Sequence, residues 1–189
     1  MANGPNTIMI IRHGEKPGEG SAPHGVNVNG EHDEHALAVR GWMRAGALAG
    51  MMAHSPSPAH PTLVRPGRVY ATAPSVQEKS RRELDTAKPT ADRLSLVVES
   101  GHGHGEEKNL ADAVLGQSAD SLIVWHHGSI PKLLGHFPVI NAGDVPHDWP
   151  ADRFDVVWVL TREQGVGGGY RFSTVDQALL AGDKSPEPA

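Results

Sequence analysis

The sequence predicts an α/β fold: a three-layer α/β/α sandwich with a mostly parallel, mixed sheet. Short apolar, β-branched runs alternate along the chain with stretches whose apolar residues repeat every three or four positions. Such alternation favours crossover connections, which place helices on both faces of one sheet. The length of 189 residues and the hydrophobic content of 38% fit one domain. We expect a single domain over residues 1–189, with its core at about 7–180 and loose termini.

Six runs are candidate strands, and the last two are expected to pair as a hairpin around the glycine-rich turn Gly165–Gly169. The six runs are Thr7–Ile11, Arg68–Ala71, Leu96–Val98, Ser121–Trp125, Asp155–Leu160 and Tyr170–Val175.

Helical spacing of apolar residues runs from Val39 to Met51, from Leu84 to Leu94 and from Leu110 to Leu115. The capping-box pattern Ser75–Glu78 predicts the start of the second helix, and Pro89 predicts a kink or a restart within it.

Two further signals concern loops and one more helix start. After the fourth strand, Ser129 is a candidate cap and Pro131 a candidate first-turn residue of another helix. The long segments Pro17–His35 and Ala53–Gly67 match neither strand nor helix patterns. Loops of this length in a compact domain are usually functional or mobile.

The composition excludes several classes of protein. A formal net charge of -5 and a pI near 6.2 argue against general binding of nucleic acids or anionic membranes. No apolar stretch approaches the roughly 20 residues that span a bilayer, and the start of the chain lacks the features of a signal peptide, so we expect a cytoplasmic protein. The chain has no cysteine, which excludes thiol nucleophiles and thiolate metal sites, but it has 12 histidines.

Polar residues follow two of the predicted parallel strands. Arg12-His13-Gly14 comes directly after the first strand, and His126-His127-Gly128 follows the fourth. Ligands of open α/β sheets bind at the carboxyl ends of parallel strands, so these residues are expected to meet. Arginine and histidine side chains around one pocket suit a dianionic phosphoryl group. In the absence of cysteine, a neutral His13 is the candidate nucleophile, and Arg12 would hold the phosphoryl oxygens.

These residues resemble the histidine phosphatase superfamily, also called phosphoglycerate mutase-like, whose signature is an Arg-His-Gly triplet after the first strand. Three further segments resemble family motifs and occur in the family's order. They are "LAVRGWMRAGALA" (Leu37–Ala49), "VYATAPSVQEKSRRELDTAKPTA" (Val69–Ala91) and "LIVWHHGSIP" (Leu122–Pro131). The family's usual Ser-Pro after the second strand is replaced by Thr72-Ala73-Pro74.

The resemblance implies a phosphohistidine intermediate on His13. It implies a phosphate pocket of His13, Arg12, a second arginine and a second histidine, without a metal. Counting back from Thr86-Ala87 selects Arg82 as the second arginine.

The resemblance leaves two choices open. For the second histidine, a branch of the family that reads Trp-x-His-x-x-Ile-Pro favours His127, and the commoner motif favours His126. For the general acid, Glu107 is preferred and Glu106 is the alternative.

The expected function is therefore metal-independent, cofactor-free hydrolysis of a small phosphomonoester through phosphohistidine. Alternatives are a phosphoglycerate mutase-type phosphotransferase and a catalytically weak phospho-ligand binding or regulatory module. A metal-binding protein using His102 and His104 is a further alternative. The substrate and the oligomeric state are not predicted.

Overall fold

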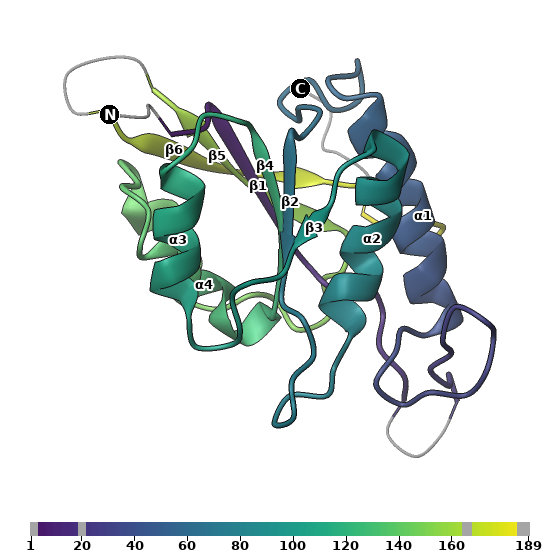
Figure 1. The fold of residues 1–189 in the computed structure, drawn as a ribbon. Coiled ribbons are helices and arrows are strands. Elements are labelled where there is room, and N and C mark those ends of the chain that lie inside the picture. The colour runs from purple at the N-terminus through teal and green to yellow at the C-terminus, as the bar shows by residue number, and fades with distance from the viewer. Residues whose placement is uncertain (1–3, 19–21, 164–167, 185–189) are drawn as a thin grey trace.

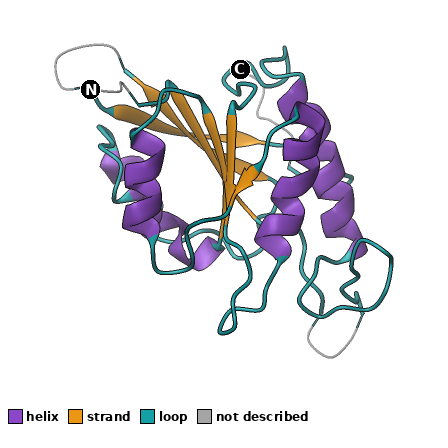
Figure 2. Ribbon diagram, in the orientation of Figure 1, coloured by secondary structure: helices purple, strands orange, loops and turns teal. Residues whose placement is uncertain are grey.

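The computed structural model describes residues 4–18, 22–163 and 168–184 of the chain. A six-stranded sheet lies between two layers of helices, with α1 and α2 on one face and α3 and α4 on the other (Figures 1 and 2). This arrangement confirms the predicted three-layer α/β/α fold.

The strand order across the sheet is β3-β2-β4-β1-β5-β6. The strands are β1 (Thr7–Arg12), β2 (Arg68–Ala71), β3 (Val98–Glu99), β4 (Ser121–Trp125), β5 (Val156–Arg162) and β6 (Tyr170–Asp176). The first four are parallel to their neighbours among themselves, whereas β5 runs antiparallel to both β1 and β6. The predicted hairpin is thus confirmed, although part of its turn lies outside the described residues. The third strand begins two residues later than expected.

The main helices are α1 (Val39–Ala53), α2 (Arg82–Leu94), α3 (Glu107–Leu115) and α4 (Ile130–Leu134). Short 3-10 turns occupy His127–Ser129 and Ala142–Asp144. No helix in the described ranges has both the length and the apolar character needed to cross a membrane.

The expected start of helix α2 was wrong, and the helix does not restart at Pro89. The hydroxyl of Ser75 does accept the Glu78 N–H (3.0 Å), but this pair forms an exposed turn and the helix begins only at Arg82. Pro89 does not interrupt α2, which continues from Arg82 to Leu94. Packing along α1 holds this helix together despite the hydrogen bond that proline cannot donate (Figure 1).

The sheet buries residues on both of its faces. On β1, Ile8 and Ile10 belong to the core beneath α3 and α4, whereas Met9 and Ile11 belong to the core beneath α1 and α2. Side chains of a strand point alternately to opposite faces, so the continuous apolar run of β1 matches a strand covered on both sides. Its central position is therefore a direct result of its sequence.

The described residues nearest to the two chain ends are held by long-range contacts. The Pro5 carbonyl accepts hydrogen bonds from the Tyr170 hydroxyl (2.9 Å) and from Arg162 (3.1 Å). At the other end, the side chain of Asp183 is 3% exposed and ion-paired with Arg44. These contacts join residues far apart in the chain, and polar composition alone does not reveal them.

Strand direction determines which loops meet at one edge of the sheet. The carboxyl ends of β1, β2 and β4 reach this edge, so the loops that leave these strands lie there. Because β5 is antiparallel, the loop that enters it, 150–155, reaches the same edge. The edge therefore combines outgoing and incoming loops.

Two glycines of α1 differ in the space around them. A Cβ atom on Gly41 would lie 2.5 Å from the Glu15 carbonyl oxygen, whereas one on Gly46 would meet nothing within 4 Å. Alanine is favoured over glycine in helices by about 1 kcal/mol. Gly46→Ala should therefore raise the free energy of unfolding by up to about 1 kcal/mol, whereas Gly41→Ala should lower it. Urea denaturation of both variants would check this, and equal effects would contradict it.

Candidate active site

The candidate site begins where β1 ends. Arg12 is the last residue of β1 and pairs with Trp125, the last residue of β4, so His13 and His126 emerge side by side. Both Arg12 and His13 are only 3% exposed. Burying such groups is costly unless they find partners, and the surrounding loops supply them.

His13 is held as a neutral imidazole. Its Nδ1 lies 2.7 Å from the Gly14 carbonyl oxygen, which can only accept, so Nδ1 carries the proton and Nε2 keeps its lone pair. Burial, together with the positive charges of Arg12 and Arg82, lowers the pKa of His13 to about 3 although the Gly14 carbonyl opposes the shift. A neutral ring with a free Nε2 is the form in which histidine acts as a nucleophile.

Arg12 is held by the loop that enters β5. Its Nη1 donates to the Ala151 carbonyl at 2.7 Å, and its guanidinium lies 3.9 Å from the centre of the Phe154 ring. The Phe154 ring also lies 6.2 Å from that of His13. Burial lowers the pKa of Arg12 to about 10, so the side chain remains a cation at neutral pH. Its buried Nε has no hydrogen-bond partner among the described residues.

Arg82 opens helix α2 near the same turn. Its Nε donates to the Ala36 carbonyl (3.2 Å) and its Nη2 to the Glu34 carbonyl (2.6 Å). The Thr86 hydroxyl accepts the Gly14 N–H (2.8 Å) and donates to the Arg82 carbonyl (2.7 Å). Thr86 thus fastens the first turn of α2 to the residue after His13.

The two candidate histidines after β4 face different neighbours. The ring of His127 lies edge-on to that of His13, with 6.0 Å between centroids. The ring of His126 lies 5.0 Å from His104, on the exposed loop before α3. Burial and the charge of Arg12 lower the pKa of His127 to about 4. The structure therefore brings His127, rather than His126, up to the ring of His13.

The two candidate acids, Glu107 and Glu106, differ in burial and in their hydrogen-bond partners. Glu107 is fully buried, 2.7 Å from the Lys132 ammonium, and accepts hydrogen bonds from the Gly105 N–H (3.0 Å) and from the Trp125 indole (3.5 Å). Burial favours the neutral acid, but the hydrogen bonds from Lys132 and from the Gly105 N–H, with the charge of Lys132, outweigh it and lower the pKa of Glu107 to about 2. Glu106 is exposed and accepts the Gly103 N–H at 2.7 Å. The environment of Glu107 thus favours its ionised form, and its role as a proton donor stays a prediction.

A different carboxyl group, Glu83, was missed by the sequence motifs. It follows Arg82 directly, is 4% exposed, and accepts a hydrogen bond from the Ser80 hydroxyl at 3.2 Å. Burial raises its pKa, against opposing contributions that include the hydrogen bond from Ser80 and the charge of Arg82, and its carboxylate in turn stabilises the charged form of Arg12. Glu83 lies three residues before Thr86, which places both on one face of α2.

Phe154, Ala151 and Lys132 were also missed: Phe154 and Ala151 lie outside every recognised motif, and Lys132 directly follows one but is not part of it. The only signal for Phe154 was its place directly before a predicted strand. The antiparallel direction of that strand, which decides the edge at which Phe154 lies, is not readable from a single sequence.

Within the described residues, no group of three or more histidine, aspartate or glutamate side chains is arranged to hold a metal ion, and this includes the loop of His102 and His104.

The neutral state of His13 is directly measurable. Its Cε1 proton resonance, assigned by comparison with His13→Asn, should not titrate between about pH 8 and about pH 5, because burial and two guanidinium charges oppose protonation. In the urea-unfolded chain the same resonance should titrate near the usual value of 6.5. A midpoint near 6.5 in the folded protein would contradict a buried, neutral His13.

Three solved structures share this architecture at low sequence identity. The chain matches the Agrobacterium tumefaciens protein assigned as phosphohistidine phosphatase SixA with 15% identity and a TM-score of 0.53, over 84% of this chain and 92% of that chain. Mycobacterial hydrolase 1 matches with 16% identity and a TM-score of 0.51, over 93% of this chain and 100% of that chain. A mycobacterial glucosyl-3-phosphoglycerate phosphatase, solved with VO3, matches with 14% identity and a TM-score of 0.51, over 89% of this chain and 97% of that chain.

No protein-family model matches the sequence, and a search of curated protein sequences gives no significant match. At these identities the structural likeness concerns the fold. The chain therefore has the fold of these three structures, in agreement with the α/β/α architecture that its sequence predicts.

Proposed function

We propose that the protein hydrolyses a phosphomonoester through a phosphohistidine intermediate on His13. The observation that carries this proposal is the environment of the imidazole: Nδ1 donates to the Gly14 carbonyl, so the unprotonated Nε2 is free to attack phosphorus. The phosphatase names of two structural neighbours support hydrolysis as the reaction class.

The pocket groups suit the charge of the transferred phosphoryl group. In this proposal Arg12 and Arg82 bind phosphoryl oxygens and His127 adds a ring nitrogen. Arg82 keeps N–H groups beyond the two that hold Ala36 and Glu34. Fixed cationic donors stabilise the charge that spreads over the oxygens in the transition state.

The reaction then balances in two steps. His13 Nε2 forms a bond to phosphorus while the bond from phosphorus to the ester oxygen breaks, and the leaving oxygen takes up a proton. A water molecule next attacks phosphorus and returns a proton to the group that protonated the leaving oxygen, the P–N bond breaks, and inorganic phosphate leaves. No metal or organic cofactor takes part in either step of this scheme.

The proton donor in this proposal is Glu83 rather than Glu107. A buried carboxyl group with a raised pKa keeps its proton closer to neutral pH, as a general acid must. Glu107 instead remains ionised beside Lys132. Glu83 is also adjacent to Arg82, and it influences the charge state of Arg12.

The nucleophile can be tested with p-nitrophenyl phosphate in excess EDTA. The wild type should turn over and yield an acid-labile phosphoprotein, and His13→Asn should lose both. His136→Asn is a matched control, because His136 is an exposed histidine beyond α4. Stoichiometric phosphate binding without turnover, unchanged in His13→Asn, would instead indicate a binding module. Phosphoryl transfer between positions of phosphoglycerate would indicate a mutase.

The proton donor can be tested by changing the leaving group. Loss of a general acid should slow glycerol phosphate hydrolysis about 10²-fold or more, but p-nitrophenyl phosphate hydrolysis much less, because p-nitrophenolate leaves without protonation. Glu83→Gln should show this selectivity in kcat. Glu107→Gln should affect both substrates equally, and selectivity in that variant alone would restore Glu107 as the acid.

A further inference from the structure

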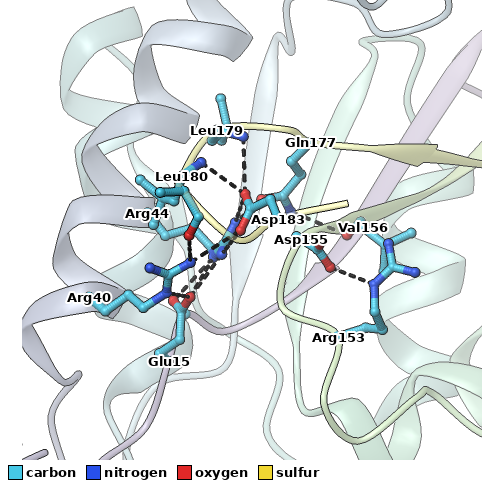
Figure 3. Close-up of polar contacts among 12 residues, drawn as sticks. Glu15, Arg40, Arg44, Arg153, Asp155, Val156, Gln177, Leu179, Leu180 and Asp183 are labelled. Atoms are coloured by element: carbon cyan, nitrogen blue, oxygen red, sulfur yellow. Dashed lines mark hydrogen bonds and ion pairs between the residues drawn. The ribbon is translucent and has the colours of Figure 1, made fainter. Parts of the chain in front are cut away.

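Arg44 contacts both Glu15, two residues after the candidate nucleophile, and Asp183, near the other end of the described chain (Figure 3). It lies on α1 and is 2% exposed. Its Nη2 is 2.8 Å from Glu15 Oε1 and 2.8 Å from Asp183 Oδ1. Glu15 follows the His13-Gly14 turn, whereas Asp183 belongs to the segment after β6, Gln177–Lys184. Arg44 is therefore a buried link between this segment and the turn.

The guanidinium group of Arg44 is fully used. Its Nε donates to Glu15 (3.1 Å), its Nη1 donates to Gln177 Oε1 (2.9 Å) and to Asp183 Oδ2 (3.0 Å), and its Nη2 bonds to both carboxylates. Arginine has five N–H donors, and these contacts engage all of them. A fully engaged, planar guanidinium fixes the positions of its partners much more tightly than a single surface ion pair does.

The charges in this cluster balance. Arg40 places its Nε 3.0 Å from Glu15 and donates through Nη2 to the Ala181 carbonyl at 2.8 Å. Two carboxylates, Glu15 and Asp183, thus face two guanidinium groups. Asp183 also accepts the N–H groups of Leu179 and Leu180, each at 3.0 Å. The Gln177–Lys184 segment is therefore folded around its own aspartate as well as bound to α1.

The turn after His13 has little freedom to move. The Glu15 carbonyl accepts the Ala38 N–H at 3.0 Å, and Thr86 holds the Gly14 N–H. The backbone of Glu15 lies so close to Gly41 that a Cβ atom there would clash. Arg44, together with Arg40, fixes the remaining group, the Glu15 carboxylate.

The same segment also contacts the loop beneath Arg12. The Gln177 N–H donates to the Asp155 carbonyl at 2.8 Å, and the Lys184 N–H donates to the Asp155 carboxylate at 2.7 Å. Asp155 directly follows Phe154, whose ring lies against the Arg12 guanidinium. The segment is thus connected to the surroundings of Arg12-His13 at two places: to Glu15 through Arg44, and to the loop before β5 through Asp155.

We propose that the Gln177–Lys184 segment positions the nucleophile. Arg44 and Asp183 are the positioning residues, because their ion pairs connect this segment to the His13-Gly14-Glu15 turn. This inference rests on the proposed function. Neither residue touches the substrate. Their effect is to keep His13 Nε2 aligned for attack on phosphorus.

The test compares Asp183→Asn with two matched controls. Asp92→Asn makes the same chemical change in the exposed Lys88–Asp92 pair. Phe172→Leu weakens the core beside Trp158, away from this cluster, and separates local effects from a general loss of stability. For each variant, kcat and KM for p-nitrophenyl phosphate and the amide hydrogen exchange of a peptide spanning residues 11–16 are measured.

Asp183→Asn should reduce kcat about tenfold or more while leaving KM nearly unchanged, since small misalignments of a reacting group are costly. Exchange in residues 11–16 should become faster than in Phe172→Leu at equal loss of melting temperature. Equality with Phe172→Leu in either measurement, with an active wild type, would overturn the positioning role alone. A wild type without turnover would overturn the proposed function itself.

Discussion

The burial of a cation and an imidazole at the end of the central strand is the constraint on which the site depends. β1 must be apolar on both faces to occupy the middle of the sheet, yet it ends in Arg12 and His13, which remain almost fully enclosed. Enclosure removes water as a partner, so nearby backbone and side chains must replace it. The Ala151 carbonyl, the Phe154 ring and the Gly14 carbonyl do so.

This constraint also supports the chemistry that we propose for the site. An exposed histidine would be partly protonated near neutral pH and would lose nucleophilicity. Enclosure beside two guanidinium groups keeps His13 neutral, and those same groups carry the charge that a phosphoryl dianion requires. One arrangement thus favours both a reactive imidazole and an anion-binding pocket.

The sequence predicts the architecture, and it points to the centre of the candidate site more clearly than to its periphery. Alternating strands and helices, and the residues that follow β1 and β4, are local signals, and they identify His13, Arg12 and the pair His126 and His127. The partners of Glu107 and Asp183 are not local. Lys132 lies 25 positions beyond Glu107, and Arg44 lies 139 positions before Asp183. Only the folded chain shows that the Glu107 carboxylate is ion-paired with Lys132 and that the Asp183 carboxylate is ion-paired with Arg44.

Strand β5 runs antiparallel to its neighbour β1, and this affects the order in which contacts form during folding. Because the incoming loop of β5 and the segment after β6 both complete the surroundings of Arg12-His13, the site draws on residues from 12 to 183. Contacts of such high sequence separation close large loops and form late, after local helices and neighbouring strands. A partly folded chain can then have most of its secondary structure while the His13 imidazole is still solvated. The buried, neutral imidazole on which the proposed activity depends would therefore form late in folding.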